Sequence, residues 1–493
     1  MKGYAMQTLV HYISVLNDTI NRFVWGVPML VFFLAVGVLY TIGTRCFQFR
    51  HFQLWFSETI LTCFKKSPPP KPPGPGLQAG KKKHTISPWQ AMATALASTG
   101  GVGNIAGVAT AITAGGPGAL FWMWVSALLG MMTHYGETVL GICFRNKDKD
   151  GHYSGGPMIY MEKGLHCKWL ACFFSLFCIG AALGMGNMSQ SNSMADALNH
   201  SWGTPKLVIG IAAALITGLV ITGGIGRITV VSEKLVPIMS ILYIIGALLV
   251  VMTHLGNVPA AFRSIFHEAF NFRAAGGGIL GYGIAAAMRT GISRGVFSNE
   301  AGLGSSVMVH AAADVDHPAI QGMWGIFEVF ADTMVVCTIT GLAILCSNVY
   351  DQTAYLNAMQ LDQMYQTTRY MDALPNGVPL ASAAFASTFG SLGDIFVSFS
   401  ILLFGLATLL SWSYFGEQAV IYLFGRKIVP AYKFVYIFFI VIGAVARLDF
   451  VWSVSDTLNG LMAIPNLIAI TVLSPTVFRV TKDYCVKYRG GGG

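Results

Sequence analysis

Glycine and small polar residues interrupt a hydrophobic segment at residues 96–107, and their types fit the binding of a small ligand. The sequence there is Leu-Ala-Ser-Thr-Gly-Gly-Val-Gly-Asn-Ile-Ala-Gly, with three glycines in four positions. Glycine costs about 1 kcal/mol relative to alanine inside a helix, and a backbone group freed inside a bilayer must find another polar partner. We therefore expect a broken helix whose free N–H and C=O groups hold a small ligand and an ion. The alternative is close helix packing through the Gly103 and Gly107 pair.

A second interrupted segment lies at residues 288–306. It contains four glycines and three ionisable groups within a hydrophobic span. Matching interrupted helices in the two halves of a membrane protein are the best sequence pointer to a transporter binding site. An odd number of helices in each half would invert one half relative to the other, so we expect the two breaks to meet near the membrane midplane. Two unrelated glycine-rich packing faces are the alternative.

The composition indicates a polytopic membrane protein. Of the 493 residues, 54% are hydrophobic and 11% are charged, and the mean hydropathy is +0.59. Ordinary soluble domains have about 25% charged residues. The nine cysteines show no CxxC pair or Cys/His cluster with metal-ligand spacing, so we expect neither a disulfide nor a metal cofactor. The N-terminus lacks the compact apolar run of a cleavable signal peptide.

The hydrophobic pattern predicts an all-α fold with eleven transmembrane helices. Residues 1–23 are too polar to span, because of Asn17, Asp18 and Asn21, and are expected to form a short interfacial helix. Residues 24–44 are expected to form the first span, and 45–87 a basic, proline-rich cytoplasmic linker. Ten further spans follow in two groups of five, at 88–255 and 277–477, joined by an external connection at 256–276. The expected spans are residues 88–114, 118–144, 168–194, 205–223, 235–255, 277–309, 319–346, 391–424, 430–447 and 456–477.

Positive charge predicts the orientation of these spans. Of the 31 Lys and Arg residues, 22 fall in segments on one side of the membrane, seven on the other and two within a span. Since cytoplasmic loops carry the excess of Lys and Arg, the N-terminus should be outside and the C-terminus, with the tail at 478–493, inside. The same distribution explains the basic pI without nucleic-acid binding. The long loop at 347–390 is then external, where it could fold over the mouth of the protein.

Several long motifs resemble those of the alanine or glycine:cation symporter family. They occur in order through most of the chain, at Gly103–Thr110, Gly118–Glu137, Gly186–Ala197, Arg294–Ser305 and Trp412–Glu417. The resemblance implies a leucine-transporter-like fold, with one extra N-terminal helix before a five-plus-five inverted repeat whose first and sixth core helices are broken. It also implies sodium-coupled import of small neutral amino acids by alternating access, without enzymatic activity, in the plasma (inner) membrane of a prokaryote.

A zwitterionic substrate fits these breaks. An α-carboxylate favours clustered backbone N–H groups at a helix N-terminus, so we expect residues 101–103 to form its cradle. The ammonium group needs neutral acceptors, which the second break around residues 293–302 can supply. Two aromatic side chains are expected to close over the substrate, with core packing as the alternative. The family motif points Gln190 and Asn192 of the third core helix toward the substrate. The expected substrate-binding residues are Thr99, Gly101, Val102, Gly103, Gln190, Phe297, Asn299, Gly302, Thr408 and Trp412.

The resemblance also implies a sodium site between the first and eighth core helices. Sodium is a hard cation that carbonyl and hydroxyl oxygens can coordinate. The expected ligands are the Ala97 and Gly100 carbonyls and the Thr408 and Ser411 hydroxyls, with Asn104 as a further candidate. No acidic residue lies at 96–107, which favours sodium over a proton. Proton coupling through Glu300 stays open, as does the choice among alanine, glycine, serine and glutamine.

Ionisable residues inside spans are functional candidates by default. They are Arg289, Arg294, Glu300, Glu328, Asp332 and Glu417. We expect most of them to be structural and to form ion pairs or hydrogen bonds, with Arg294 and Glu300 the candidates for gating. His134 and His310 are interpreted as structural histidines. An ion channel or a membrane enzyme is disfavoured, because the sequence shows neither ring-forming repeats nor a nucleophile or zinc motif.

Overall fold

The protein is a bundle of helices in the computed structural model, which describes residues 15–64, 86–147, 153–270, 282–365, 367–446 and 448–490. Within these ranges the only sheet is a two-stranded antiparallel one, β1 (Asn146–Lys147) with β2 (Tyr153–Ser154). Seven described helices are long and apolar enough to cross a membrane. They are Val15–Gly43, Lys168–Trp202, Gly224–Thr253, Pro318–Cys346, Ser391–Phe424, Arg426–Val445 and Val451–Lys487.

The first described helical segment differs from the expected interfacial helix. Residues 15–24 are helical and lead through a two-residue turn into α2 (Val27–Gly43), while residues 1–14 lie outside the described ranges. The Asn17 amide donates to Ser453 Oγ (2.7 Å) and the Asn21 amide to Thr457 Oγ1 (3.1 Å), both on α24 (Leu448–Gly490). The polar residues that disfavoured a span are therefore satisfied by another helix. The short helices α3 (Phe47–Arg50), α4 (Phe52–Glu58) and α5 (Ile60–Phe64) follow.

The predicted first interruption is present. Helix α6 (Pro88–Thr99) starts with a capping box in which Ser87 Oγ accepts from the Gln90 N–H (3.1 Å) and the Gln90 side chain accepts from the Ser87 N–H (3.2 Å). It ends at Gly100, where a Cβ would lie 2.7 Å from the Leu96 carbonyl oxygen. A short 3₁₀ turn, η1 (Val102–Asn104), leads into α7 (Ala106–Gly115).

The second interruption is longer than the first. Helix α15 (Tyr282–Asn299) ends before an irregular segment at 300–306, and α16 (Val307–His310) is a single turn. Glu300, Gly302 and Gly304 have φ values of 56°, 94° and 75°. Glycine adopts this left-handed region without a steric penalty, which accounts for two of the three positions. The start of the predicted span, residues 277–281, lies outside the described ranges.

Helices α7, α15 and α17 (Pro318–Val329) pack against α8 (Gly118–Phe144), and α6 also contacts α17. A five-residue π-helix, η2 (Gly184–Met188), connects α10 (Lys168–Leu183) to α11 (Ser189–Trp202). A second, η4 (Phe330–Cys337), connects α17 to α18 (Thr338–Cys346). Since π-helical turns often occur at functional sites, η2 and η4 are candidate parts of such a site.

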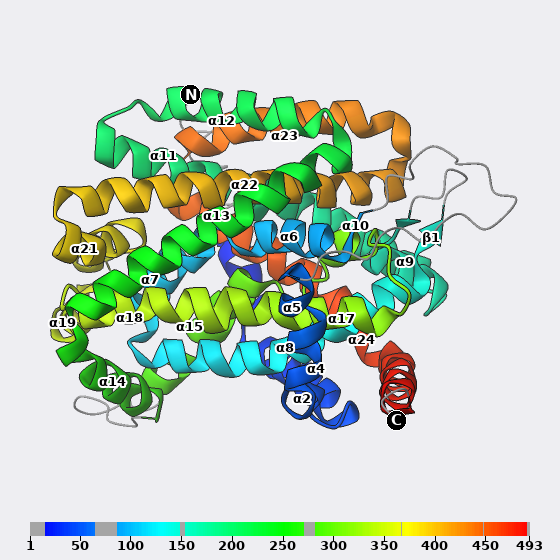
Figure 1. The fold of residues 1–493 in the computed structure, drawn as a ribbon. Coiled ribbons are helices and arrows are strands. Elements are labelled where there is room, and N and C mark those ends of the chain that lie inside the picture. The colour runs from blue at the N-terminus through cyan, green and yellow to red at the C-terminus, as the bar shows by residue number, and fades with distance from the viewer. Residues whose placement is uncertain are drawn as a thin grey trace, which may run out of the picture.

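Helices α12 (Lys206–Ile221), α22 (Ser391–Phe424) and α23 (Val429–Val445) lie together on one side of this group, above α6 and α8 in the view of Figure 1. Helix α12 packs on α23, and both α6 and α10 pack on α22. Helix α13 (Gly224–Thr253) starts eleven residues before the expected boundary at 235, so Arg227 and Lys234 lie on a helix and not in a loop. Helix α9 (Pro157–Lys163) follows the hairpin, and the 3₁₀ turns are η3 (Leu255–Asn257) and η5 (Arg426–Ile428).

Short helices gather at the end of the bundle opposite the β1–β2 hairpin (Figure 1). They are α14 (Val258–Phe270), α19 (Gln352–Tyr365), α20 (Arg369–Asp372) and α21 (Val378–Phe389). Helix α21 contacts α7, α13 and α22, and the Thr113 hydroxyl donates to Asn376 Oδ1 (2.9 Å). The long loop at 347–390 therefore packs against the second half of the first broken helix.

Glycine 186 in η2 makes the closest approach to α22, which gives a stability test. A Cβ at this position would lie 2.2 Å from Trp412 Cγ. We expect Gly186→Ala to cost about 1–3 kcal/mol through overpacking and to lower the melting temperature in detergent. Gly226→Ala on α13 is the matched control, because no atom lies within 4 Å of its added Cβ. Equal melting temperatures for the two variants would contradict the close contact.

Candidate functional site

Hydroxyl groups of α22 face carbonyl groups of α6 just before the first break. Thr408 Oγ1 donates to the Ala97 carbonyl (3.1 Å), and Ser411 Oγ donates to the Thr94 carbonyl (2.8 Å). Both side chains are fully buried. The predicted pairing of Thr408 with Ala97 is present, whereas Ser411 contacts Thr94, which the sequence did not single out. Buried carbonyl and hydroxyl oxygens of this kind suit a hard cation.

The first break itself is covered by Gln190 of α11. The Val102 N–H, expected to bind a carboxylate, donates to Gln190 Oε1 (3.2 Å), and Gln190 Nε2 donates to the Met185 carbonyl in η2 (3.0 Å). A Cβ on Gly101 would lie 2.8 Å from Thr408 Oγ1 and 3.2 Å from Gln190 Oε1. The absence of a side chain at Gly101 thus brings three of the predicted substrate-site residues together.

A second polar group connects the two breaks through Asp332 of η4. Asn104 Nδ2 donates to Asp332 Oδ1 (2.5 Å), and the Ser298 hydroxyl lies 2.5 Å from Asp332 Oδ2 and 2.9 Å from Asn104 Oδ1. The Thr333 hydroxyl donates to Asp332 Oδ2 (3.0 Å). Sequence reasoning identified Asn104 but not Ser298 or Thr333; the carboxylate inside a span was the available signal. Asn104 and Asp332, together with Gly100, line a cavity of about 320 Å³ between α6, α13 and η4.

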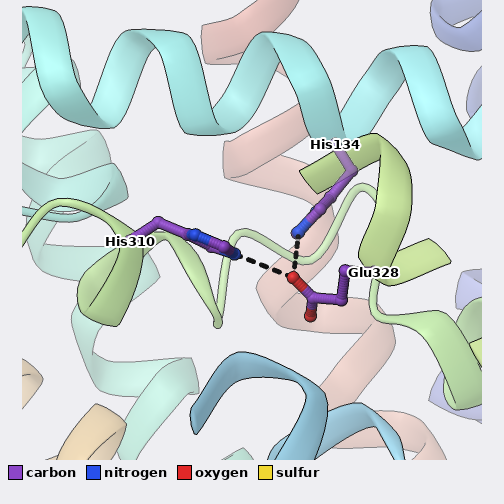
Figure 2. A group of neighbouring side chains, drawn as sticks. All are labelled: His134, His310 and Glu328. Atoms are coloured by element: carbon purple, nitrogen blue, oxygen red, sulfur yellow. Dashed lines mark hydrogen bonds and ion pairs between the residues drawn. The ribbon is translucent and has the colours of Figure 1, made fainter. Parts of the chain in front are cut away.

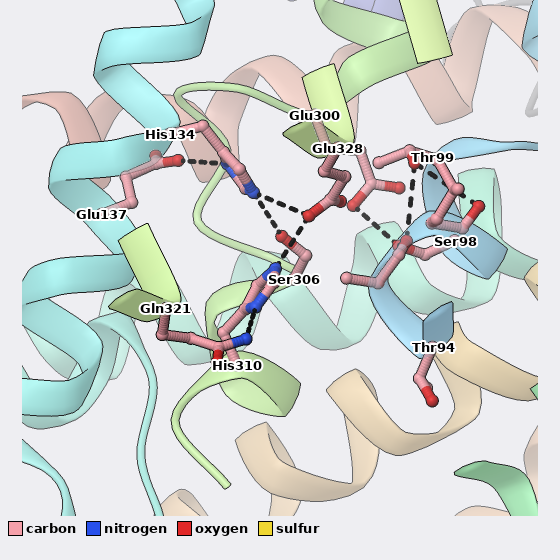
Figure 3. A network of polar contacts seen from close by, with 12 residues as sticks. Thr94, Ser98, Thr99, His134, Glu137, Glu300, Ser306, His310, Gln321 and Glu328 are labelled. Atoms are coloured by element: carbon pink, nitrogen blue, oxygen red, sulfur yellow. Dashed lines mark hydrogen bonds and ion pairs between the residues drawn. The ribbon is translucent and has the colours of Figure 1, made fainter. Parts of the chain in front are cut away.

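Glu300 connects the second break to α6 and α22. Its Oε1 accepts from the Trp412 indole N–H (2.9 Å), and its Oε2 accepts from Ser98 Oγ (3.4 Å) and from the Ser305 hydroxyl. Figure 3 shows Ser98 and Glu300 directed toward each other from the two broken helices. Trp412 is fully buried with its indole ring against Gly186. This tryptophan holds the carboxylate and does not face an open cavity.

Phe297 lies on the other side of the first break. A Cβ on Gly103 would lie 3.1 Å from the Phe297 ring, which stacks on Trp452 with ring centroids 5.2 Å apart. Arg294 forms a bidentate ion pair with Asp456 (2.6 and 3.2 Å). Arg294 and Trp452 line a cavity of about 450 Å³ toward α21.

Two cavities flank the first break along its own helix. The cavity of about 450 Å³ is lined by Ala106 and Thr110, beyond the break, whereas a cavity of about 520 Å³ near β2 is lined by Ile86, before α6. The break at Gly100 and Gly101 lies between these positions in the chain. One cavity therefore lies beyond the break in the chain and the other before it.

Four other residues singled out from the sequence mainly hold the local structure. Asn299 Nδ2 donates to Thr333 Oγ1 (3.1 Å) and its Oδ1 caps the Ala301 N–H (3.0 Å). The Gly302 carbonyl accepts from Asn466 Nδ2 (2.9 Å), and the Thr99 hydroxyl lies 3.5 Å from carbonyls of its own helix. Asn192 donates to the Gly443 and Ala446 carbonyls at the end of α23.

Comparison with known proteins identifies the fold and then the family of the chain. The fold is similar to that of MhsT, a transporter with the leucine-transporter fold, in its crystal structure with L-phenylalanine. The TM-score is 0.56 and the identity 14%, over 80% of this chain and 90% of that one. This likeness shows the fold. The chain belongs to the sodium:alanine symporter family, whose sequence model matches residues 10–491, and it is therefore an integral membrane transporter.

Two relatives have names that state a substrate. The sodium/alanine symporter AgcS of Methanococcus maripaludis is 40% identical over 477 residues, which is 96% of this chain and 97% of that one. The probable sodium/glutamine symporter GlnT of Bacillus subtilis is 34% identical over 487 residues, 98% of this chain and 92% of that one.

The contact between Trp412 and Glu300 gives the prediction from this site. Trp412→Phe keeps an aromatic ring but removes the donor to a buried carboxylate, and a buried group without its partner costs about 1–3 kcal/mol. We expect a lower melting temperature in detergent than for wild type. Trp169→Phe on α10 is the control, because that tryptophan is 63% exposed. A Trp412→Phe protein as stable as this control would show that the indole N–H does not hold Glu300.

Proposed function

We propose that the protein is a sodium-coupled symporter that imports small neutral amino acids of the alanine and glycine class by alternating access. The main support for this proposal is that the Thr408 and Ser411 hydroxyls donate hydrogen bonds to carbonyls of α6 beside the first break. In this proposal sodium lies between α6 and α22. The Ala97 carbonyl and the Thr408 hydroxyl coordinate it, and Gly100 and Ser411 complete the shell.

The substrate carboxylate is proposed to take the place of the Gln190 side chain at the first break. Gln190 Oε1 now accepts the Val102 N–H, as a carboxylate oxygen would. The backbone N–H groups of residues 101–103 then donate to the carboxylate, and the Thr408 hydroxyl lies next to Gly101. Phe297 over Gly103 forms the lid on one side, with the Arg294–Asp456 ion pair behind it. Opening of that ion pair would admit substrate from the 450 Å³ cavity.

The group around Asp332 is proposed as a second place for a cation. Asn104 and Ser298 bring oxygen atoms from both breaks to the carboxylate, and the side chains are buried. A carboxylate can carry either sodium or a proton, which keeps proton coupling as the alternative coupling mode. A preference for glutamine or serine is the alternative in substrate, supported by the likeness to GlnT.

We further propose eleven transmembrane helices in an inverted five-plus-five arrangement after the extra N-terminal helix. The interruptions of α6–α7 and α15–α16 open the two groups of five. The four spans beyond these seven long helices are α8 (27 residues), Lys206–Ile221 and the two broken helices, α6–α7 and α15–α16. The distribution of Lys and Arg supports an external N-terminus and a cytoplasmic C-terminus. The α21 end of the bundle would then be external.

Uptake into liposomes tests the function. Purified protein in liposomes should accumulate radiolabelled alanine when sodium is outside and choline inside, and accumulation should collapse when sodium is equal on both sides. Competition by glycine, serine, glutamine and D-alanine ranks the substrates. Uptake that ignores sodium but follows a proton gradient would support the proton alternative. Uptake indifferent to every cation gradient would overturn symport.

Thr408→Ala tests the ion site. Loss of one oxygen ligand worth about 1.4 kcal/mol corresponds to a tenfold change in affinity. We therefore expect the sodium concentration for half-maximal uptake to rise about tenfold or more. Thr471→Ala is the matched control, because that hydroxyl donates only to the Leu467 carbonyl of its own helix (2.6 Å). Unchanged sodium dependence in Thr408→Ala would remove Thr408 from the ion site.

A further inference from the structure

Two histidines and a glutamate converge beside Glu300, from which they are distinct (Figure 3). His134 lies on α8, His310 ends α16 and Glu328 lies on α17. The Nε2 atoms of both imidazoles contact the same oxygen, Glu328 Oε2, at 3.0 and 2.8 Å. Figure 2 shows both rings directed at this carboxylate from different segments. All three side chains are fully buried.

The far side of each imidazole is held by another side chain. His134 Nδ1 lies 3.0 Å from Glu137 Oε2, and His310 Nδ1 lies 2.7 Å from the Gln321 amide (Figure 3). Histidines that coordinate metals through Nε2 almost always have Nδ1 held by a carboxylate, a carbonyl or water, which fixes the ring orientation. The pattern of an inner group of three ligands and an outer group of oriented partners is therefore present.

Hydrogen bonds within the described residues do not satisfy every polar atom of this cluster. Glu328 Oε1 and Gln321 Oε1 are buried and have no hydrogen-bond partner. If His134 donates to Glu137 and Glu328, it is an imidazolium, and two carboxylates then share one positive charge in a place without solvent exposure. Uncompensated charge and unpaired acceptors in such a place are costly. A dication would neutralise both carboxylates.

We propose that His134, His310 and Glu328 bind a first-row divalent metal ion of the zinc class. Two histidines and a glutamate are a known protein ligand set for zinc, and a tetrahedral ion with bonds of about 2.0–2.1 Å separates its ligand atoms by about 3.3 Å. The observed separations of 2.8 and 3.0 Å need to widen by only a few tenths of an ångström. Ser306 Oγ, 3.1 Å from His134 Nε2, is positioned as the fourth ligand.

The surrounding amides fit the same ion. Reversing the Gln321 amide places its oxygen, now unpaired, against His310 Nδ1–H, which is the protonation state that Nε2 coordination requires. Asn466 of α24 donates to Glu137 Oε1 (2.5 Å) and so holds the carboxylate that orients His134. The ion would join α8, α17 and the chain after the second break. Since the ligands are fully buried, it is a resident structural ion acquired during folding and not a transported one.

Metal content of the intact protein tests this site. The protein is purified with a tag free of histidine from cells grown with added zinc, and bound metal is measured by mass spectrometry. We expect about one zinc per chain, falling below about one tenth in His310→Gln and in Glu328→Gln. His267→Gln is the control, because that histidine is 63% exposed on α14, and it should keep the full content. A wild-type protein with no metal, or equal content in wild type and both site variants, would overturn the proposal.

A second variant separates metal loss from misfolding. His310→Cys keeps a zinc ligand at the same position, so it should retain about one metal per chain. In cells grown with cobalt, wild type should show the visible absorption of tetrahedral cobalt, and His310→Cys should add a thiolate-to-cobalt band. Glu137→Gln should weaken metal retention against a chelator about 10–100-fold. Absence of the cobalt spectrum in wild type would contradict the site even if the other variants do not fold.

Discussion

The structure depends on the need to satisfy backbone groups wherever a helix is interrupted inside the bilayer. In the hydrocarbon region no water is available to a free N–H or C=O group, so an interruption persists only where protein atoms supply the partners. Both breaks meet this condition with side chains from other helices. Thr408 and Ser411 of α22 donate to α6 carbonyls, and Asn466 of α24 donates to the Gly302 carbonyl. The polar side chains of the scaffold therefore define where the site can form.

Three side-chain amides show how the partners of the interrupted helices differ in their roles. Gln190 occupies the Val102 N–H, Asn299 caps the Ala301 N–H, and Asn104 reaches Asp332. In the proposed mechanism the first of these contacts is exchanged for a ligand, because a glutamine oxygen and a carboxylate oxygen accept in the same way. The second contact holds the shape of the break. A site that binds and releases a solute needs both kinds of contact.

The sequence predicted the positions of the breaks and most helix boundaries, because glycine clusters and polar residues within hydrophobic spans are local signals. It did not predict which turn of α22 faces which carbonyl, and Ser411 therefore pairs with Thr94 unexpectedly. Ser298 and Thr333 were missed for the same reason, since their role arises only when η4 is placed beside both breaks. The N-terminal segment looked too polar to span because its partners lie more than 400 residues away. His134 and His310 were both interpreted as structural histidines, because no spacing rule connects them to each other or to Glu328.

The hydrogen bonds from Asn17 and Asn21 to α24 have a consequence for biosynthesis. These contacts join residues separated by 436 positions, so the first helix to leave the ribosome receives its partners only when the last helix has been made. At translation rates of about 5–20 residues per second, that interval is tens of seconds. During that time two amides on the first helix have no intramolecular partner from α24. A nascent chain truncated before α24 would therefore lack the hydrogen-bond partners of Asn17 and Asn21.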